Sequence, residues 1–273
     1  VLAAAVAAPV SASGDVRPVA LYLAAAIHDS LGDAAAAASA RAEARRSDRT
    51  WAFPNGLDAL DALNAALAAD PEDAVAHSLL GMLLYANGRR RSATEHWACA
   101  IGLGLDDPVL FRNAALAAYN VEHDDQKAWL LYERAVATAP ADARLRYEQD
   151  QLAIRLGQPG PVRLERLAPV ENLVLTRDDF TIEYVRLLTS TGSAARAVDI
   201  LRTRPFHPWE GGEGQAIAAW DAALAAAGLP PADPPAGLGE ARAQYVPPVA
   251  RHSDGATDYF ATSLPELLLF SRE

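Results

Sequence analysis

Four side chains that could act together on a ligand lie in the segment RPFHPWEGGEG, which spans residues 204–214. They are His207, Trp209, Glu210 and Glu213, on a backbone that contains three glycines and two prolines. An indole can stack on the apolar face of a sugar ring, and a pair of carboxylates is what glycosidic hydrolysis uses. These four residues are therefore candidates for a carbohydrate-binding or carbohydrate-processing site.

The same loop also has a purely structural interpretation. Prolines and glycines shape turns between helices, and Phe206 and Trp209 can fill the space between two helices. Glu210 or Glu213 can accept hydrogen bonds from the first amides of a helix that we expect over residues 215–227. We favour structural packing first, ligand contact second and catalysis last, because catalysis requires a mutual geometry that spacing alone does not give. We therefore assign no catalytic residue to this chain.

Metal and cofactor sites have little support in the sequence. The single cysteine, Cys99, excludes a disulfide within the chain and a zinc site made of four thiolates. His28, His77 and His96 fall on expected helices without the His-Glu-x-x-His spacing of a zinc site. A glycine-rich phosphate loop after a strand is also missing from the pattern. We expect no metal and no cofactor.

The composition favours helices and an acidic surface. Of the 273 residues 51% are hydrophobic and only 7% are aromatic, because much of the apolar content is alanine, the strongest helix former. This predicts an all-α fold. The net charge of −11 argues against a nucleic-acid partner, which requires a basic surface, and disfavours anionic membranes.

The first residues, VLAAAVAAPVSASG, are apolar but lack an initiator methionine and a charged leading segment. We therefore expect no signal peptide, and the run is too short to span a bilayer. Its simplest interpretation is the second helix of a truncated repeat. Together with the single cysteine, this favours a cytoplasmic location and no membrane partner.

Small and large residues recur with a period of about 34 residues, the spacing of a two-helix repeat. The best copy begins at Ala74. Its matching positions are His77, Leu80, Gly81, Leu83, Leu84, Gly88, Ala93, Trp97 and Ala100. Further copies begin at Pro108, Ala143 and Asp178, and the copy from Pro108 has one inserted residue in the turn at 122–126. The pattern resembles the tetratricopeptide repeat (TPR), in which small residues lie where two antiparallel helices touch.

We predict an all-α fold of the TPR type, an α-α superhelix in which about five helix pairs form a right-handed solenoid. The pattern is interrupted around residues 48–56 and 204–214 and in the proline-rich stretch 228–257. We expect the solenoid over residues 1–203, with its first pair truncated. Residues 204–273 are expected to form the loop, a helix and an irregular cap packed on the solenoid.

The concave face of a TPR array commonly binds peptides, and the first helix of each pair lines it. In this sequence that face mixes tyrosine, arginine and apolar side chains, which suits a protein, a peptide or an intramolecular partner. The groove residues that we select are Arg112, Tyr119, Arg144, Tyr147, Gln151 and Arg155, while Tyr85 and Asn120 fall at equivalent positions.

A further resemblance is carried by the runs FPNGLDALDALNAALAADPEDAVAHSLLGMLLY, RPFHPWEGGEGQ and DYFATSLPELLLF. They are similar to the C-terminal half of large bacterial TPR proteins, in which a β-sandwich domain similar to aldose epimerases precedes the repeats. The resemblance implies a carbohydrate connection and a parent chain with a sugar-active domain. We therefore expect an interaction scaffold that binds a partner protein or that domain. The alternative is a carbohydrate module at the 204–214 loop.

Overall fold

The computed structural model describes residues 16–49, 52–206, 214–235, 238 and 270. Every regular element in this part of the chain is a helix. The chain divides into two compact units: unit 1 is Val1–Thr138 with Arg272–Glu273, and unit 2 is Ala139–Ser271.

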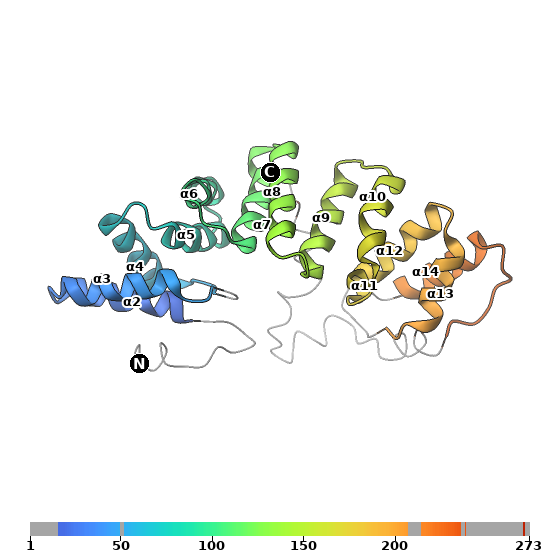
Figure 1. Ribbon diagram of the computed structural model, residues 1–273, viewed down its shortest axis with the longest axis horizontal. Helices are drawn as coiled ribbons and strands as arrows, with labels where there is room; N and C mark the ends of the chain where they lie inside the picture. Colours follow the sequence, from blue (N-terminus) through green and yellow to red (C-terminus); the bar gives the residue numbers. More distant parts are fainter. Residues whose placement is uncertain (1–15, 50–51, 207–213, 236–237, 239–269, 271–273) are drawn as a thin grey trace. The chain divides into compact units, whose positions relative to one another are not determined.

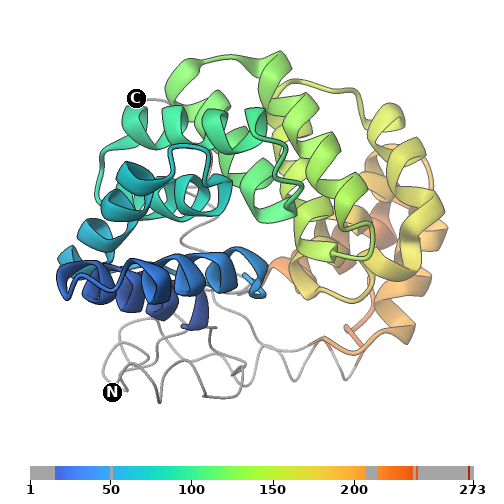
Figure 2. The same cartoon turned by 60° about the vertical axis from the view of Figure 1, so that its left-hand side comes forward.

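Unit 1 is built from helix pairs joined by short turns (Figure 1). Its helices are α2 (Arg17–Ser30), α3 (Ala34–Arg46), α4 (Gly56–Ala69), α5 (Ala74–Ala86), α6 (Arg90–Gly102), α7 (Pro108–Ala117), the π-helix η1 (Ala118–Glu122) and α8 (Asp125–Thr138). Helices α2 and α3 pack side by side, as do α5 with α6 and α7 with α8 (Figure 2). Helix α4 contacts both α2 and α5, so it joins the first pair to the next.

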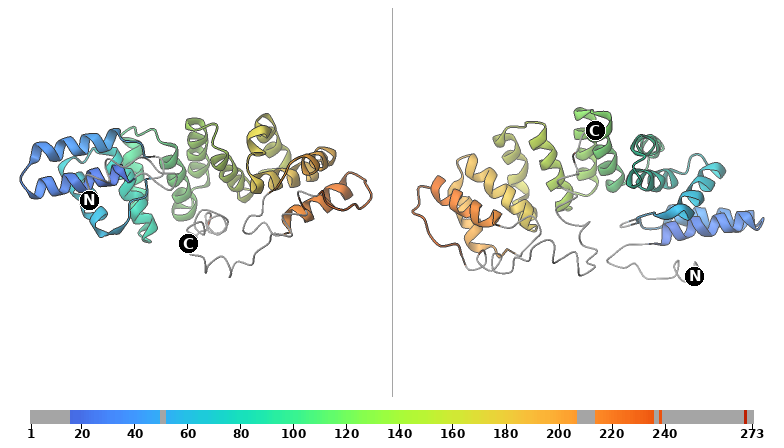
Figure 3. Two further views of the ribbon diagram at one scale, coloured as in Figure 1. Left: turned by 90° about the horizontal axis from the view of Figure 1, so that it is seen from below. Right: turned by 180° about the vertical axis from the view of Figure 1, so that it is seen from behind.

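Unit 2 has shorter and less regular pairs. Its helices are α9 (Ala143–Arg155), α10 (Gly160–Leu167), the 3₁₀ turn η2 (Ala168–Val170), α11 (Glu171–Val174), α12 (Asp178–Ser190), α13 (Ala194–Thr203) and α14 (Gln215–Ala226). Helices α12, α13 and α14 pack on one another (Figure 3). Phe180, Tyr184 and Trp220 form part of their common core, and the indole Nε1 of Trp220 donates to the carbonyl oxygen of Ala232 at 2.9 Å.

Two backbone features recur at intervals of about 34 residues. The carboxylates of Asp73, Asp107 and Asp142 accept hydrogen bonds from the first amides of α5, α7 and α9. Left-handed backbone ends the first helix of each pair at Gly88, His123, Gly157 and Gly192, with φ of 77°, 56°, 68° and 87°. Such caps begin and end helices at fixed points, so the sequence period becomes a period of helix pairs. The all-α fold of the TPR type is confirmed.

Gly81 lets α5 and α6 approach each other closely. A Cβ atom at this position would lie 2.4 Å from Nε1 of Trp97. The indole is only 2% exposed, and its Nε1 donates to the carbonyl oxygen of Ser78 at 3.1 Å. Trp97 is therefore a core residue that is held by a hydrogen bond as well as by packing.

The predicted interruptions coincide with the ends of helices. The stretch around residues 48–56 separates α3 from α4, and the helix expected over residues 215–227 is α14. Most of the loop and cap predicted for residues 204–273 lies outside the described residues. The division of the chain at residue 203 therefore stays a prediction.

Candidate functional site

The four loop residues proposed for a carbohydrate site, His207, Trp209, Glu210 and Glu213, lie outside the described residues. The helix that follows them begins as predicted, after Gly214 with a left-handed φ of 73°. The carbohydrate site therefore stays a prediction from the sequence. The six predicted groove residues, by contrast, are all described: two lie in unit 1 and four in unit 2.

The inserted residue of the second strong repeat is accommodated at the end of its first helix. There the backbone forms the π-helix η1, and His123 follows with a left-handed φ of 56°. A π-turn takes one more residue than an α-turn, and such turns are often found at functional sites. Tyr119 and Asn120 lie inside η1 and are 8% and 2% exposed. The insertion thus changes the local geometry at two groove positions.

Asn120 links this π-helix to the preceding repeat. Its side-chain Nδ2 donates to the hydroxyl of Tyr85 at 3.2 Å. The Tyr85 ring also lies against Trp97, with 5.3 Å between ring centroids, and the guanidinium carbon of Arg90 is 5.6 Å from its centroid. Tyr85 is half-buried, so this oriented side chain remains partly accessible to solvent.

Arg112 lies on α7, seven residues before Tyr119, and is half-buried. Its Nη1 donates to the side-chain oxygen of the adjacent Asn113 at 3.1 Å. We define the unit 1 face as Tyr85, Arg112, Tyr119 and Asn120. The sequence pointed to these positions, but it did not reveal the hydrogen bond between Tyr85 and Asn120. The inserted residue was the only signal that the geometry would differ here.

In unit 2 the predicted groove residues all lie on α9. We define the α9 stripe as Tyr147, Gln151 and Arg155, which are spaced by four residues and so share one side of the helix. Tyr147 is 7% exposed, with its ring centroid 5.4 Å from that of Phe180. Gln151 is half-buried and Arg155 is exposed.

Arg144, the sixth predicted groove residue, is committed to its own helix. Its Nε donates to Oε1 of Glu148 at 3.0 Å, and that carboxylate is almost completely buried. One turn of helix separates the two residues, so the ion pair lies along α9. Arg144 therefore contributes to the stability of α9 through this ion pair.

Helix α9 is polar but buried on one side, and an ion-pair cluster holds it to α10. Asp150 is 1% exposed and receives two hydrogen bonds from Arg163, at 3.0 and 2.6 Å. Arg166 adds a third at 3.1 Å. Bidentate arginine pairs are geometrically specific, so this cluster fixes the rotation of α9 about its axis. It thereby determines which side of α9 carries the stripe.

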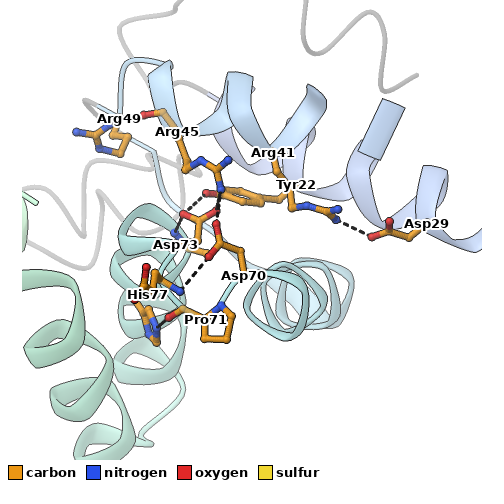
Figure 4. Close-up of polar contacts among 11 residues, drawn as sticks. Tyr22, Asp29, Arg41, Arg45, Arg49, Asp70, Pro71, Asp73 and His77 are labelled. Carbon is orange, nitrogen blue, oxygen red and sulfur yellow. Dashed lines mark hydrogen bonds and ion pairs between the residues drawn. The ribbon is translucent and has the colours of Figure 1, made fainter. Parts of the chain in front are cut away.

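A second buried network holds the first helix pair of unit 1 to α5 (Figure 4). The carboxylate of Asp73 is fully buried and accepts hydrogen bonds from the Tyr22 hydroxyl at 2.9 Å and from the Ala76 amide at 3.0 Å. Arg45 bridges Asp73 and Asp70, at 3.2 and 3.0 Å. Burial, and then the negative charge of Asp73, raises the pKa of Tyr22 far above its usual range. The network therefore ties side chains of α2 and α3 to the first turn of α5.

His77 and His96 form a contact between α5 and α6. Nδ1 of His77 lies 2.8 Å from Nδ1 of His96, and Nε2 of His77 lies 3.0 Å from the carbonyl oxygen of Pro71. A carbonyl oxygen can only accept a hydrogen bond, so Nε2 of neutral His77 is assigned as the donor to Pro71. Its Nδ1 is then the acceptor of a hydrogen bond from Nδ1 of His96. Burial, and then the charge of His77, lowers the pKa of His96, while Glu95 acts in the opposite direction.

We expect the folded chain to lose stability as the pH falls below the ordinary imidazole value of 6.5, because unfolding then frees His96 to bind a proton. The loss of stability should stop growing once the pH is below the lowered pKa that His96 has in the folded chain. The measurement is Tm by circular dichroism between about pH 7.5 and about 5.5. His96→Gln should flatten this part of the profile relative to His28→Gln, the control on α2. Equal slopes for the two variants would contradict this assignment.

No helix in the described part of the chain has the length and apolar composition needed to cross a membrane. Those same residues contain no group of three or more His, Cys, Asp or Glu side chains placed to hold a metal ion. For the whole chain, the expected lack of metal and cofactor stays a prediction.

No family model matches this sequence. Among solved structures, the chain is similar to YrrB, a TPR protein with an unusual peptide-binding site, at 18% identity and a TM-score of 0.45, over 63% of this chain and 82% of that one. It is similar to MamA at 17% identity and a TM-score of 0.40, over 63% of this chain and 88% of that one. A further match is a chain of the Naa15/Naa10 complex bound to HypK-THB, at 14% identity and a TM-score of 0.47, over 92% of this chain and 36% of that one.

Proposed function

We propose that this chain is a protein-interaction scaffold whose first helices in each pair bind peptide segments of a partner protein. The observation that carries the proposal is the unit 1 face. There an inserted residue forms η1, and Asn120 within it orients the half-buried ring of Tyr85 through a hydrogen bond. A π-turn interrupts regular helix geometry, and such turns are frequent at functional sites. Here the turn also orients an aromatic ring, which supports a binding surface.

The chemistry of the unit 1 face suits a peptide. Tyrosine and arginine are the side chains that most often dominate binding energy at protein interfaces, because they combine apolar area with hydrogen-bonding groups. Tyr85 offers a ring whose position its neighbours already fix, so little conformational entropy is lost when it binds. Arg112 provides donors for carbonyl or carboxylate oxygens of the bound segment.

The partner belongs to one of two classes, another protein or a domain of the same parent chain. The second class follows from the resemblance to bacterial TPR proteins with a β-sandwich domain. Both classes would present a polypeptide segment to the same face. A peptide library tests the recognition itself and does not require the partner to be known.

Peptides selected from a random library on the full chain are expected to lose affinity by about tenfold or more with Tyr85→Ala or Arg112→Ala, as for interface hot spots. Tyr85→Phe keeps the ring and removes only the oxygen that accepts from Asn120, so we expect a smaller loss. Binding is measured by calorimetric titration. The matched control is Leu130→Ala, which removes a 51% exposed apolar side chain from α8, the second helix of the same pair.

The proposal fails if the library yields no binder. It also fails if the selected peptides bind the Tyr85→Ala and Arg112→Ala variants as tightly as the Leu130→Ala variant. Circular dichroism of each variant confirms that the helices are retained, so that a loss of affinity reports on the face itself.

A further inference from the structure

One residue far along the chain lies against the α9 stripe. The ring of Phe270 packs on the guanidinium of Arg155, with 4.8 Å between the guanidinium carbon and the ring centroid. Phe270 is only 7% exposed. More than one hundred residues separate the two in sequence, and both belong to unit 2. A cation packed on an aromatic face is an attractive contact, and burial of the ring adds apolar contact area.

Phe270 lies on the side of α9 that we identified as a binding face. Arg155 turns back along the helix, and its Nη1 donates to the carbonyl oxygen of Gln151 at 3.1 Å. The guanidinium therefore lies over the side that carries Gln151. Leu152 and Ala153, the next two residues of α9, are 0% exposed, and Tyr147 at the other end of the stripe packs against Phe180 in the core of unit 2. Phe270 thus contacts the Arg155 end of the α9 stripe, while the Tyr147 end packs into the core of unit 2.

We infer that Phe270 is an intramolecular ligand of the α9 stripe and holds the place that an aromatic side chain of a partner peptide would take. The inference rests on the proposed function and names the class of ligand for unit 2. In the sequence Phe270 directly follows Leu267, Leu268 and Leu269. The ligand class is therefore a short segment in which an aromatic residue stands beside aliphatic residues.

A segment of the same chain that occupies the α9 stripe lowers the apparent affinity of the stripe for a free peptide. A segment of the same chain competes at an effective concentration that is often in the millimolar range. A free peptide then binds more weakly, in proportion to the fraction of molecules in which the face is open. If the stripe is open in about one molecule in ten, removing the Phe270 ring strengthens the binding of a free peptide about tenfold.

The test uses the full chain and a fluorescent peptide of sequence TSLPELLLFSRE, which corresponds to residues 262–273. Fluorescence anisotropy measures its Kd for wild type and for Phe270→Ala, and the variant is expected to bind about tenfold more tightly. Adding Arg155→Ala to Phe270→Ala should abolish that gain. A peptide in which the phenylalanine is replaced by alanine should bind neither protein.

Two further variants keep the test interpretable. Leu229→Ala removes a different apolar side chain of unit 2, one that is 40% exposed, and should leave the peptide affinity at the wild-type value. Phe270→Leu keeps an apolar side chain but removes the ring, so it serves if Phe270→Ala disturbs the fold. It should strengthen peptide binding by a smaller factor than Phe270→Ala.

Equal affinities of wild type and the folded Phe270 variants overturn the inference. Undiminished binding after Arg155→Ala overturns it as well. The two proposals fail separately. Library peptides that depend on Tyr85 and Arg112 support the scaffold when Phe270→Ala has no effect. Binding of the phenylalanine peptide that requires Arg155 supports the α9 stripe when the library yields nothing.

Discussion

Gly81→Ala is expected to destabilise unit 1 by about 3 kcal/mol, at the upper end of the usual cost of overpacking. The added Cβ would lie 2.4, 2.6 and 2.9 Å from Nε1, Cδ1 and Cε2 of Trp97. The indole is a rigid plane that is 2% exposed, so it has no room to move aside. Any displacement also weakens the hydrogen bond from its Nε1 to the Ser78 carbonyl, now 3.1 Å long.

Gly102→Ala is the matched control for Gly81→Ala. Gly102 is the last residue of α6, and an added Cβ there would meet no atom within 4 Å. Alanine in a helix restricts the unfolded chain more than glycine does, so this variant should gain up to about 1 kcal/mol. Urea unfolding followed by circular dichroism measures both. Similar free energies of unfolding for the two variants would show that α5 and α6 do not pack as closely as described.

Asp73→Ala is expected to cost about 3 kcal/mol, because it removes a helix cap and leaves a buried hydroxyl without its acceptor. The fully buried carboxylate accepts from the Ala76 amide and from Tyr22. The ion pair with Arg45 contributes less, since 37% of that arginine side chain is exposed to water. The loss should appear as a lower urea midpoint.

Asp142→Ala separates the cap from the network. Asp142 is exposed and caps α9 through the amides of Arg144 and Leu145, at 2.8 and 3.2 Å. Its replacement should cost about 1 kcal/mol, the usual value for a cap alone. Asp73→Asn keeps an acceptor oxygen and should fall between the two. If Asp73→Ala costs no more than Asp142→Ala, the buried hydrogen bond to Tyr22 adds nothing to stability.

The helix pairs could be predicted because their determinants are local. Aspartate caps, glycines at left-handed turns and small residues at helix contacts all recur with the repeat, so Gly81 and Trp97 could be assigned from spacing alone. The extra residue near position 122 was also visible. Its accommodation in η1 was not, because spacing alone does not say whether an extra residue lies in the turn or widens the end of the helix.

The candidate site was harder to predict, since it depends on contacts between distant residues. Asp150 lies on a helix whose sequence is strongly polar, yet it is buried because two arginines of α10 neutralise it. The position of Phe270 against Arg155 could not be inferred from any periodic pattern. The functional interpretation of the loop at residues 207–213 still depends on its sequence alone.

The π-helix after α7 lets α8 keep the same side turned toward its neighbours despite the inserted residue. An α-helix turns by about 100° per residue, so an uncompensated insertion would rotate the following helix by that angle. Ala128 and Tyr132 of α8 are nevertheless 0% exposed, as the contact face of a second helix requires. The widened turn takes up the extra residue, so α8 keeps its contact face against α7 although the chain between them is longer.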